Sequence, residues 1–353
     1  MTTIDRTDAL VERLFGATLG ALELYSIYLG SQLGFYRALA QHGSLTPPEL
    51  ADHAGIAPRY AVEWLEQQAV AGLLDVEDGE PRRYGLAPDH ARVLADPDDA
   101  AHVAPFAHML AGIGGVLPQV AQAYRTGGGV PYSAYGAAFR HGQGHINRPA
   151  FTHELPTDWL DAMPDIRARL RDQGGRVADI GCGQGFSTTA VAKAFPNASV
   201  DGIDVDRASI ADATRQAAEA GLDGRVRFLH ADAAELEGPY DLILMLEALH
   251  DMTRPADALG AARNALADDG AVLVVDEKVA DAFTAPGDEV ERMMYGWSVT
   301  HCLPTQLVEQ PSAALGTVMR SHTVRELAAE AGYTRVDVLP VDNDFFRLYR
   351  LHP

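Results

Sequence analysis

The regular alternation of strand and helix patterns after Arg176 constrains the fold more than any other feature of this sequence. Short apolar runs alternate with stretches whose apolar residues recur at helical spacing, which predicts a mostly parallel sheet with helices on both faces. The seven predicted strands are 177–180, 199–203, 226–230, 240–245, 271–275, 335–339 and 345–350, and the helices are 186–194, 207–220, 256–267 and 323–331. Only Pro340–Asp344 separates the last two strands, so they must pair antiparallel.

The N-terminal part begins with a long helical pattern from Ala9 to Ala40, with Gly30 and Gly34 as candidate breaks. This pattern predicts one long helix or two joined helices. A second start signal follows at Thr46-Pro-Pro-Glu49, where an N-cap, a first-turn proline and a capping-box acid predict a helix from Pro47 to about His53.

The next segment is predicted to complete a small N-terminal domain. Pro58–Leu73 has helical spacing, and Leu74–Val76 and Tyr84–Leu86 read as two short strands around the turn Glu77–Arg83. Helix, turn, helix and hairpin in this order predict a winged helix. The segment that would enter a DNA groove carries one arginine against two acids, Arg59 against Glu63 and Glu66, which argues against DNA binding.

The connecting segment from Pro88 to about Leu170 is predicted to be mostly helical, with interruptions at Thr126–Pro131 and His141–His145. A glycine-rich entry followed by aromatics suits a lid over a site, and filling of an interdomain core is an equal alternative. No chemistry is assigned to His141, His145 or His153. We therefore expect three parts, namely a winged-helix and dimerisation domain (1–100), a helical linker and lid (101–160) and a catalytic domain (161–353).

The amino-acid composition argues against several classes of binding partner. The 353 residues include 28 Lys and Arg against 49 Asp and Glu, a net charge of −21 that disfavours nucleic acid and anionic lipid. No run of 18 apolar residues is present, and acids and arginines within the first twenty residues break any secretory signal. The two cysteines form neither a disulfide framework nor a zinc pattern. We expect a cytoplasmic protein that binds neither nucleic acid nor membrane.

The first predicted strand of the regular region ends in a glycine-rich turn, Asp179-Ile-Gly-Cys-Gly-Gln-Gly185. Gly181 and Gly183 carry no Cβ, so the backbone can approach a ligand closely while the next helix presents its N–H groups. Residue 186 is Phe, which departs from the dinucleotide pattern GxGxxG, and no GK[ST] follows to make a phosphate-binding P-loop.

Two acids accompany this turn at the same predicted sheet edge. Asp204 ends the second strand, nineteen residues after Gly185, where a carboxylate can accept hydrogen bonds from ribose hydroxyls. Asp232 lies just beyond the third strand. An ordinary tight turn with strand-end acids is the alternative.

The segment Val177–Asp206 resembles the cofactor motif of class I S-adenosylmethionine (SAM) dependent methyltransferases, which have a Rossmann-like seven-stranded sheet. The winged helix before it extends the resemblance, over the whole chain, to plant and bacterial small-molecule O-methyltransferases. It implies that Gly181 and Gly183 line the methionine part, Asp204 holds the ribose, Asp232 with Ala233 frames the adenine, and Leu246 or Glu247 flanks the sulfonium. The full implied cofactor set is Asp179, Gly181, Cys182, Gly183, Asp204, Val205, Asp232, Ala233, Leu246 and Glu247.

The same resemblance points to His250-Asp251 as the catalytic pair, because a His-Asp pair follows the strand-four aspartate, here Asp241, in these enzymes. An imidazole beside the sulfonium can remove the proton of an acceptor hydroxyl. The sequence departs from the family where Met252 replaces the usual aromatic residue. The acid that orients the histidine corresponds to Asp276 or Glu277. A histidine that caps a helix or packs on the sheet is the alternative.

A second histidine, His301, lies in the insertion Trp297–Pro304, which in this fold covers the acceptor pocket. Trp297 and His301 are therefore predicted to contact substrate. A metal held by His250 and His301 is a further alternative, because imidazole suits first-row ions and some actinobacterial C-methyltransferases of similar sequence use iron held by two histidines.

The predicted function is SAM-dependent methyl transfer to a small molecule, with O-methylation favoured and His250 as general base. A C-methyltransferase with a His250/His301 metal site and a SAM-binding winged-helix regulator are the alternatives. The apolar N-terminal helix and the resemblance imply a homodimer.

Overall fold

The computed structural model describes residues 5–222 and 224–353, which form two compact units. The first unit takes in the chain up to Gly114 together with Ala137–Pro149, and the second contains Gly115–Gly136 and Ala150–Pro353. The segment 101–160, which we expected as a separate linker and lid, is divided between the two units. The exact domain boundaries remain a prediction.

The first unit opens with two joined helices, α1 (Arg6–Gln32) and α2 (Phe35–His42), as the helical pattern predicts. The break falls at Gly34, whose φ of 75° lies in the left-handed region that glycine adopts without strain. Gly30, the other candidate break, lies inside α1, where Trp64 and Tyr36 leave no room for a Cβ. Gly30 therefore serves close packing rather than helix termination.

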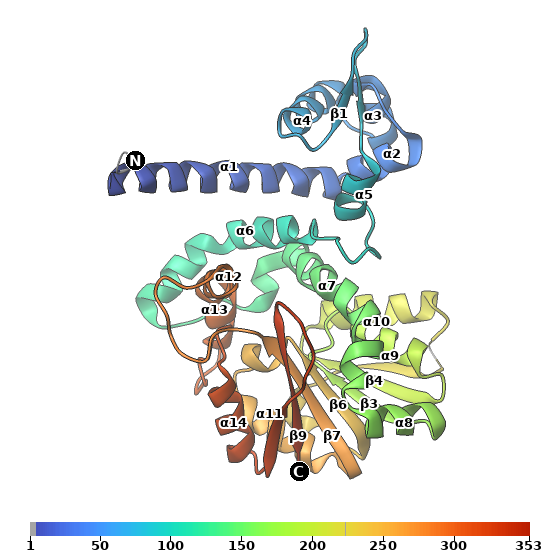
Figure 1. Cartoon of the computed structure of the whole chain (residues 1–353), viewed down its shortest axis with the longest axis vertical. Coiled ribbons are helices and arrows are strands. Elements are labelled where there is room, and N and C mark those ends of the chain that lie inside the picture. Colours follow the sequence, from blue (N-terminus) through green and yellow to red (C-terminus); the bar gives the residue numbers. More distant parts are fainter. Residues whose placement is uncertain (1–4, 223) are drawn as a thin grey trace. The chain divides into compact units, whose positions relative to one another are not determined.

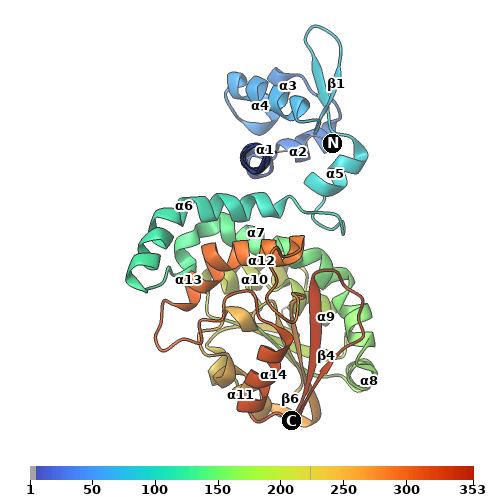
Figure 2. The same cartoon turned by 60° about the vertical axis from the view of Figure 1, so that its left-hand side comes forward.

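The remainder of this unit has the order of a winged helix. Helix α3 (Pro47–Ala54) begins with the predicted capping box of Thr46 and Glu49. Helix α4 (Pro58–Val70) and the antiparallel strands β1 (Asp75–Glu77) and β2 (Arg83–Gly85) follow, and α5 (Pro88–Leu94) ends the domain. Figure 2 shows the hairpin beside α3 and α4.

The middle of the chain is mostly helical, as predicted, and the structure corrects one of the two predicted interruptions. Its elements are α6 (Pro105–Thr126), the 3-10 turn η1 (Tyr132–Tyr135), α7 (Gly136–His153), the π-helical turn η2 (Leu155–Trp159) and α8 (Pro164–Asp172). The interruption at Thr126–Pro131 is present. The one predicted at His141–His145 is wrong, because α7 runs through it and Gly142 packs closely on α6 at Met109 and Pro105.

The second unit is built on a seven-stranded sheet in the order β5-β4-β3-β6-β7-β9-β8. Five strands are parallel, and β9 runs antiparallel between β7 and β8, as predicted. The strands are β3 (Gly175–Ile180), β4 (Ala198–Asp204), β5 (Val226–His230), β6 (Tyr240–Leu246), β7 (Leu266–Glu277), β8 (Arg335–Val338) and β9 (Phe346–His352). The chain order reverses at β3, between β4 and β6, and such a switch point is where open sheets of this kind bind ligands.

Helices cover both faces of this sheet. In Figure 1, α8, α9 (Phe186–Ala194) and α10 (Arg207–Glu219) lie on one side, and α11 (Pro255–Asn264) and α14 (Ser321–Glu330) on the other. Alternate residues of each buried strand enter two separate apolar cores, so that Val177 contributes to one and Ala178 to the other. The sequence pattern missed α12 (Glu289–Trp297), the π-helical turn η5 (Ser298–Cys302) and α13 (Leu303–Gln306), which lie in the predicted insertion.

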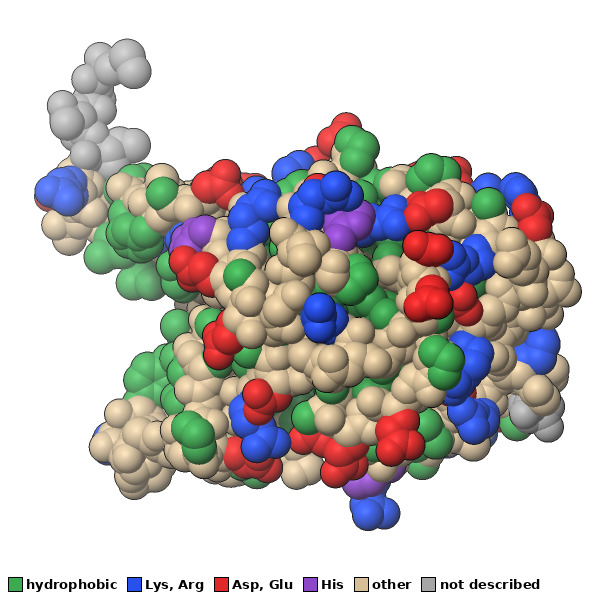
Figure 3. Space-filling view, turned by 90° about the horizontal axis from the view of Figure 1, so that it is seen from below, with side chains coloured by type: hydrophobic (Ala, Val, Ile, Leu, Met, Phe, Trp, Pro, Cys, Tyr) green, Lys and Arg blue, Asp and Glu red, His purple; other side chains and the backbone are tan. Residues whose placement is uncertain are grey.

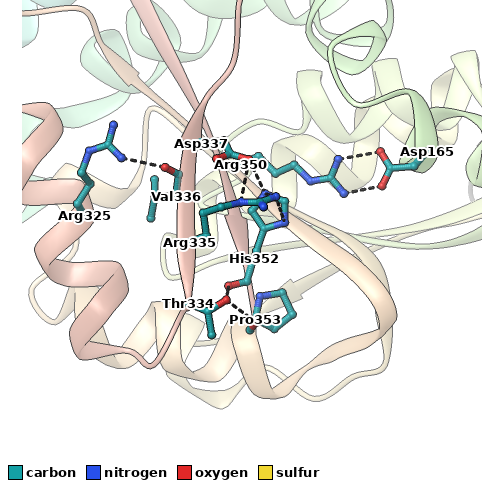
Figure 4. A network of polar contacts seen from close by, with 9 residues as sticks. All are labelled: Asp165, Arg325, Thr334, Arg335, Val336, Asp337, Arg350, His352 and Pro353. Atoms are coloured by element: carbon teal, nitrogen blue, oxygen red, sulfur yellow. Dashed lines mark hydrogen bonds and ion pairs between the residues drawn. The ribbon is translucent and has the colours of Figure 1, made fainter.

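Charged side chains accumulate at the end of the sheet where β8 is the edge strand and β9 lies beside it. Arg350 forms a bidentate pair with Asp165 of α8, and His352 contacts Asp337 of β8 at 2.9 Å (Figure 4). Charged side chains of this kind protect an edge strand from pairing with another chain. Acidic and basic side chains are interspersed on the face in Figure 3. No helix among the described residues is long and apolar enough to cross a membrane.

Candidate active site

The glycine-rich turn joins β3 to α9 with three residues in the left-handed region, Gly181, Gly183 and Gly185, whose φ angles are 72°, 51° and 79°. A Cβ on Gly181 would lie 2.5 Å from the Cβ of Ala248, so this glycine allows the chain after β6 to pack on the turn. A Cβ on Gly183 would meet nothing within 4 Å. The turn thus exposes backbone at Gly183, where a ligand can approach.

Asp204 at the end of β4 braces this turn. Its Oδ2 accepts a hydrogen bond from the Gly183 N–H at 2.8 Å, and its Oδ1 accepts one from the Asp206 N–H at 2.7 Å. Burial raises the pKa of Asp204 against the lowering effect of these two backbone donors. A carboxylate accepts about four hydrogen bonds, so capacity remains for a pair of ligand hydroxyls.

The side chains expected around a nucleoside line the same edge. Val205 is 67% exposed although apolar, which leaves it available to cover a ring. Asp232 is exposed and begins the 3-10 turn η3 (Ala233–Glu235) by accepting a hydrogen bond from the Ala234 N–H at 2.9 Å, while Ala233 is buried. This arrangement is compatible with the predicted adenine site.

Two residues of the predicted cofactor set, Asp179 and Cys182, support the glycine-rich turn from inside the protein. The Asp179 carboxylate is 1% exposed and accepts hydrogen bonds from the hydroxyls of Ser187 and Thr188 at 2.6 Å each, which ties β3 to the start of α9. Cys182 is buried, and burial raises the pKa of its thiol well above the usual value. Both side chains hold the turn in shape from within.

At the end of β6 the chain turns through Glu247, a non-glycine residue with φ of 55°. Such a conformation is uncommon for a residue with a side chain and is retained where the surroundings impose it. The Glu247 N–H donates to the Val275 carbonyl oxygen at 2.8 Å. Leu246 before it is 4% exposed and belongs to the core. Glu247 is therefore the member of this predicted pair that is placed at the site.

His250 lies in the next 3-10 turn, η4 (Leu249–Asp251), and is buried among acids. Its Nδ1 lies 2.9 Å from Asp276 Oδ1 and 3.3 Å from Glu277 Oε2, and its Nε2 lies 3.4 Å from Asp251 Oδ1. The sequence predicted one orienting acid, Asp276 or Glu277, and the structure brings both to the same ring nitrogen. Nε2 is the ring nitrogen that faces Asp251.

The charges of His250 and of the acids around it shift one another's pKa values. Burial opposes the imidazolium, but Asp276, Glu277 and Asp251 outweigh it and hold the pKa of His250 well above its ordinary value. Burial likewise opposes the Asp276 carboxylate, but the facing imidazolium keeps the pKa of Asp276 low. His250 and Asp276 thus form a buried ion pair at neutral pH, which makes His250 a strong base once Nε2 has lost its proton.

His301 is in η5, at the end of α12, and is also buried. The rings of Tyr135 and Tyr132 meet it edge-on, with centroids 4.7 Å and 5.8 Å away, and the Tyr135 hydroxyl donates to the Thr300 carbonyl oxygen at 2.8 Å. Burial lowers the pKa of His301 to about 4, so its imidazole is neutral. Trp297, the other predicted substrate residue, is the last residue of α12 and is half-buried.

Two groups of candidate metal ligands occur among the described residues. The ligand atoms of His250, Asp276 and Glu277 lie within 4.8 Å of one another, as do those of His250, Asp251 and Cys302. His301 joins neither group. The metal site of His250 and His301 therefore stays a prediction.

Sequence reasoning missed Cys302 as a member of the site. Its Sγ lies 3.5 Å from His301 Nδ1, and burial raises the pKa of the thiol to about 12, so the thiol stays protonated at neutral pH. No signal in the sequence marked it, because its position depends on the π-helical turn of η5. Tyr132 and Tyr135 were noted only as lid aromatics, and their contact with His301 is a product of tertiary packing.

Comparison with known families decides what this arrangement is. Residues 171–332 match the model of a methyltransferase domain, and residues 20–96 match that of the Rv2258c-like winged HTH domain. The chain contains a methyltransferase domain behind a winged helix. The predicted fold class and the predicted methyltransferase domain are thereby confirmed.

Curated relatives match this chain over shorter stretches. The 27-O-demethylrifamycin SV methyltransferase of Amycolatopsis mediterranei is 38% identical over 99 residues, which are 27% of this chain and 34% of that relative. The chain spans between 5% and 55% of the lengths of the first curated relatives that it matches. These likenesses cover only part of this chain and part of each relative.

Solved structures extend the likeness of fold to the entire chain. Human N-acetylserotonin methyltransferase in complex with SAM is 16% identical with a TM-score of 0.71, covering 100% of this chain and 99% of that one. The mitomycin 7-O-methyltransferase MmcR is 20% identical with a TM-score of 0.63, covering 98% of both chains. At these identities the likeness shows a shared fold.

Proposed function

We propose that this protein transfers a methyl group from SAM to a hydroxyl group of a small-molecule acceptor, with His250 as general base. The observation that carries this proposal is the contact of 2.9 Å between His250 Nδ1 and Asp276 Oδ1. An acid on one ring nitrogen fixes the tautomer and leaves the opposite nitrogen to take a proton, as in other histidine–carboxylate dyads. The names of the rifamycin and mitomycin methyltransferases support a small-molecule acceptor.

The residues at the sheet edge fit a nucleoside with a charged sulfonium. Gly183 offers exposed backbone, Asp204 has spare acceptor capacity for ribose hydroxyls, and Val205 with Asp232 and Ala233 would border the adenine. SAM supplies the electrophilic methyl group. Glu247 would lie beside the sulfonium, and Leu246, Asp179 and Cys182 would hold the surrounding backbone.

In the proposed reaction, side chains of this protein position the acceptor and remove its proton. His250 would take the hydroxyl proton on Nε2, and Asp276 and Glu277 would stabilise the resulting imidazolium from the Nδ1 side. Asp251, at 3.4 Å from Nε2, would orient this nitrogen. His301, with Tyr132 and Tyr135 around it, and Trp297 would border the acceptor. A general base contributes roughly 10²–10⁴-fold to such a reaction.

The test separates binding from turnover. Calorimetry of the full chain should detect SAM binding, and Asp204→Ala should weaken it because the buried turn loses its brace and the ribose its acceptor. His250→Asn should leave SAM affinity within a few-fold of the wild type and lower methyl transfer to an aromatic hydroxyl acceptor about 100-fold or more. Absence of SAM binding by the wild type, or the reverse pattern in the two variants, would refute the proposal.

The full assembly that we propose is a cytoplasmic homodimer. The dimer is supported by exposed apolar side chains on α1, where Leu14 is 59% exposed, Phe15 72% and Leu22 59%. The compartment is supported by the two unpaired cysteines, which fit a reducing environment.

A further inference from the structure

The helical turn that carries His301 departs from the α-helical register. At the end of η5 the Leu303 N–H donates to the Ser298 carbonyl oxygen, five residues earlier, which is the π-helical spacing. Such turns are rare, and they occur frequently at functional sites. The next residue, Pro304, has no N–H to donate to the hydrogen-bond ladder. Carbonyl groups of η5 therefore lack the partner that position 304 would otherwise supply.

Two tyrosine hydroxyls from other elements bind these carbonyl groups. An N–H at position 304 would serve Val299 in the π-helical register and Thr300 in the α-helical one, but Pro304 removes it. Instead, Tyr124 of α6 donates to the Val299 carbonyl oxygen at 3.0 Å, and Tyr135 of η1 donates to the Thr300 carbonyl oxygen at 2.8 Å. Tertiary contacts thus replace hydrogen bonds that the sequence of the helix excludes.

The two tyrosines differ in burial and in their contact with the histidine. Tyr135 is 3% exposed, whereas Tyr124 is 62% exposed. Water can take the place of an exposed hydroxyl, but loss of a buried donor leaves its acceptor without a partner. The ring of Tyr135 also meets the imidazole of His301 edge-on, with centroids 4.7 Å apart. Tyr135 therefore contacts both the backbone of η5 and the side chain that this turn carries.

The segment that carries Tyr135 is itself fixed on the helix after η5. The Val130 N–H donates to the Pro304 carbonyl oxygen at 2.9 Å. A Cβ on Gly129 would lie 2.5 Å from the same oxygen, so a glycine is needed for this approach. These residues belong to the glycine-rich stretch Thr126–Pro131, and the contacts all lie within the second unit. The stretch therefore holds Tyr135 against η5.

We propose that Tyr135 is a positioning residue for the acceptor, because its hydroxyl and its ring hold the π-helical turn that presents His301. This inference rests on the proposed function, in which His301 borders the acceptor. Tyr135 acts through this histidine rather than on the reacting atoms. A turn that is ordered before the acceptor arrives lowers the free-energy cost of binding. Loss of the hydroxyl should therefore raise the KM of the acceptor and leave kcat nearly unchanged.

The first measurement is the rate at which iodoacetamide labels Cys302, which lies in η5 and is 5% exposed. The chain's other cysteine, Cys182, is buried in the glycine-rich turn and is an internal reference that peptide mass spectrometry resolves. Tyr135→Phe should accelerate labelling of Cys302 about tenfold and leave Cys182 unchanged, because a buried carbonyl oxygen loses its donor. Tyr124→Phe should change both rates by less than about twofold, because water replaces its exposed hydroxyl.

The second measurement is methyl transfer by the full chain to a phenolic acceptor. Tyr135→Phe should raise the acceptor KM about threefold to tenfold and leave kcat and SAM affinity within about twofold of the wild type. His301→Phe keeps a ring against Tyr135 and removes the imidazole nitrogens. In that background Tyr135→Phe should raise KM no further, because two residues that act as one are not additive.

A matched control is Tyr333→Phe. The Tyr333 side chain is also buried, and its hydroxyl donates to the Leu259 carbonyl oxygen of α11 at 3.0 Å. This variant loses a hydrogen bond of the same kind away from η5. It should leave the labelling rate of Cys302 and the acceptor KM as they are in the wild type.

An unchanged labelling rate of Cys302 in a Tyr135→Phe variant that is folded by circular dichroism would overturn the inference. So would a KM effect that is undiminished in the His301→Phe background. If Tyr135→Phe fails to fold, Gly129→Ala is the second variant, because it displaces the segment from α13 and should accelerate the same labelling. Absence of methyl transfer by the wild type would count against the proposed function, while the labelling rates still decide whether Tyr135 holds η5.

Discussion

At the scale of single residues, the buried pair of His250 and Asp276 makes the activity depend on pH. The charge of Asp276 keeps the pKa of His250 above its ordinary value, so the imidazole is charged at neutral pH and must lose a proton to act as a base. We expect kcat/KM to rise with pH above neutrality as this proton is lost. Asp276→Asn should move the midpoint of the profile to lower pH, because the neutral amide no longer stabilises the imidazolium.

The same variant should lower the rate on the alkaline plateau about 10-fold to 10⁴-fold, because the ring loses its anchor. The measurement is the pH profile of kcat/KM between pH 6 and 9.5. The exposed Asp342→Asn serves as a control with an unshifted profile. A midpoint in Asp276→Asn equal to that of the wild type would show that His250 is not the titrating base.

At the scale of elements, a cluster of three histidines joins α6 and α7 within the first unit. The ring of His108 on α6 lies 4.6 Å from that of His141 on α7, and that of His141 lies 3.8 Å from that of His145. Burial, and next the neighbouring His141, lower the pKa of His108 to about 4, and the same two causes lower that of His145 to about 3. Both imidazoles are therefore neutral in the folded unit.

These histidines should make the unit sensitive to acid. Their folded pKa values lie below the unfolded value near 6.5, so the unfolded chain binds more protons and stability falls as the pH drops from about 6.5 toward 4. At about 1.4 kcal/mol per pKa unit, His108 alone contributes a loss on the order of 3 kcal/mol at the acid end.

Thermal unfolding followed by circular dichroism at pH 7.5 and pH 5 checks this expectation. The wild type should lose more stability between the two conditions than His108→Gln, which cannot be protonated. The exposed His322→Gln should behave as the wild type does. If His108→Gln and the wild type lose the same amount, burial of this histidine is not the source of the acid sensitivity.

At the scale of the whole molecule, α1 presents an apolar face that the described residues of one chain do not cover. A contiguous exposed apolar surface on a helix of 27 residues marks an interaction site. We expect the wild type to run as a dimer in size-exclusion chromatography with light scattering. A double variant, Leu14→Glu with Phe15→Glu, should shift it to monomer, because two charges on this face would have to be buried.

A matched control for the dimer is Val70→Glu, since Val70 is 91% exposed and lies at the end of α4 rather than on α1. It should remain dimeric. A wild type that is monomeric at micromolar concentration would remove the homodimer from the proposal.

The sequence by itself determined the elements that depend on local chemistry. The capping box predicted the start of α3, the candidate breaks at Gly30 and Gly34 predicted two joined helices, and the alternation of strand and helix patterns predicted the seven strands and the antiparallel pairing of the last two. Gly181, Gly183 and Asp204 were predictable for the same reason, because the ends of consecutive parallel strands meet at one edge. His250 was marked by its position after β6.

Only the tertiary structure decided which groups surround that histidine. Asp276 and Glu277 lie on β7, 26 and 27 residues from His250, and both contact the same ring nitrogen. The contact of Tyr135 with His301 and the continuity of α7 through His141–His145 likewise depend on packing between distant segments. Local patterns carry no information on such contacts, since burial and mutual charge arise only when the chain has folded.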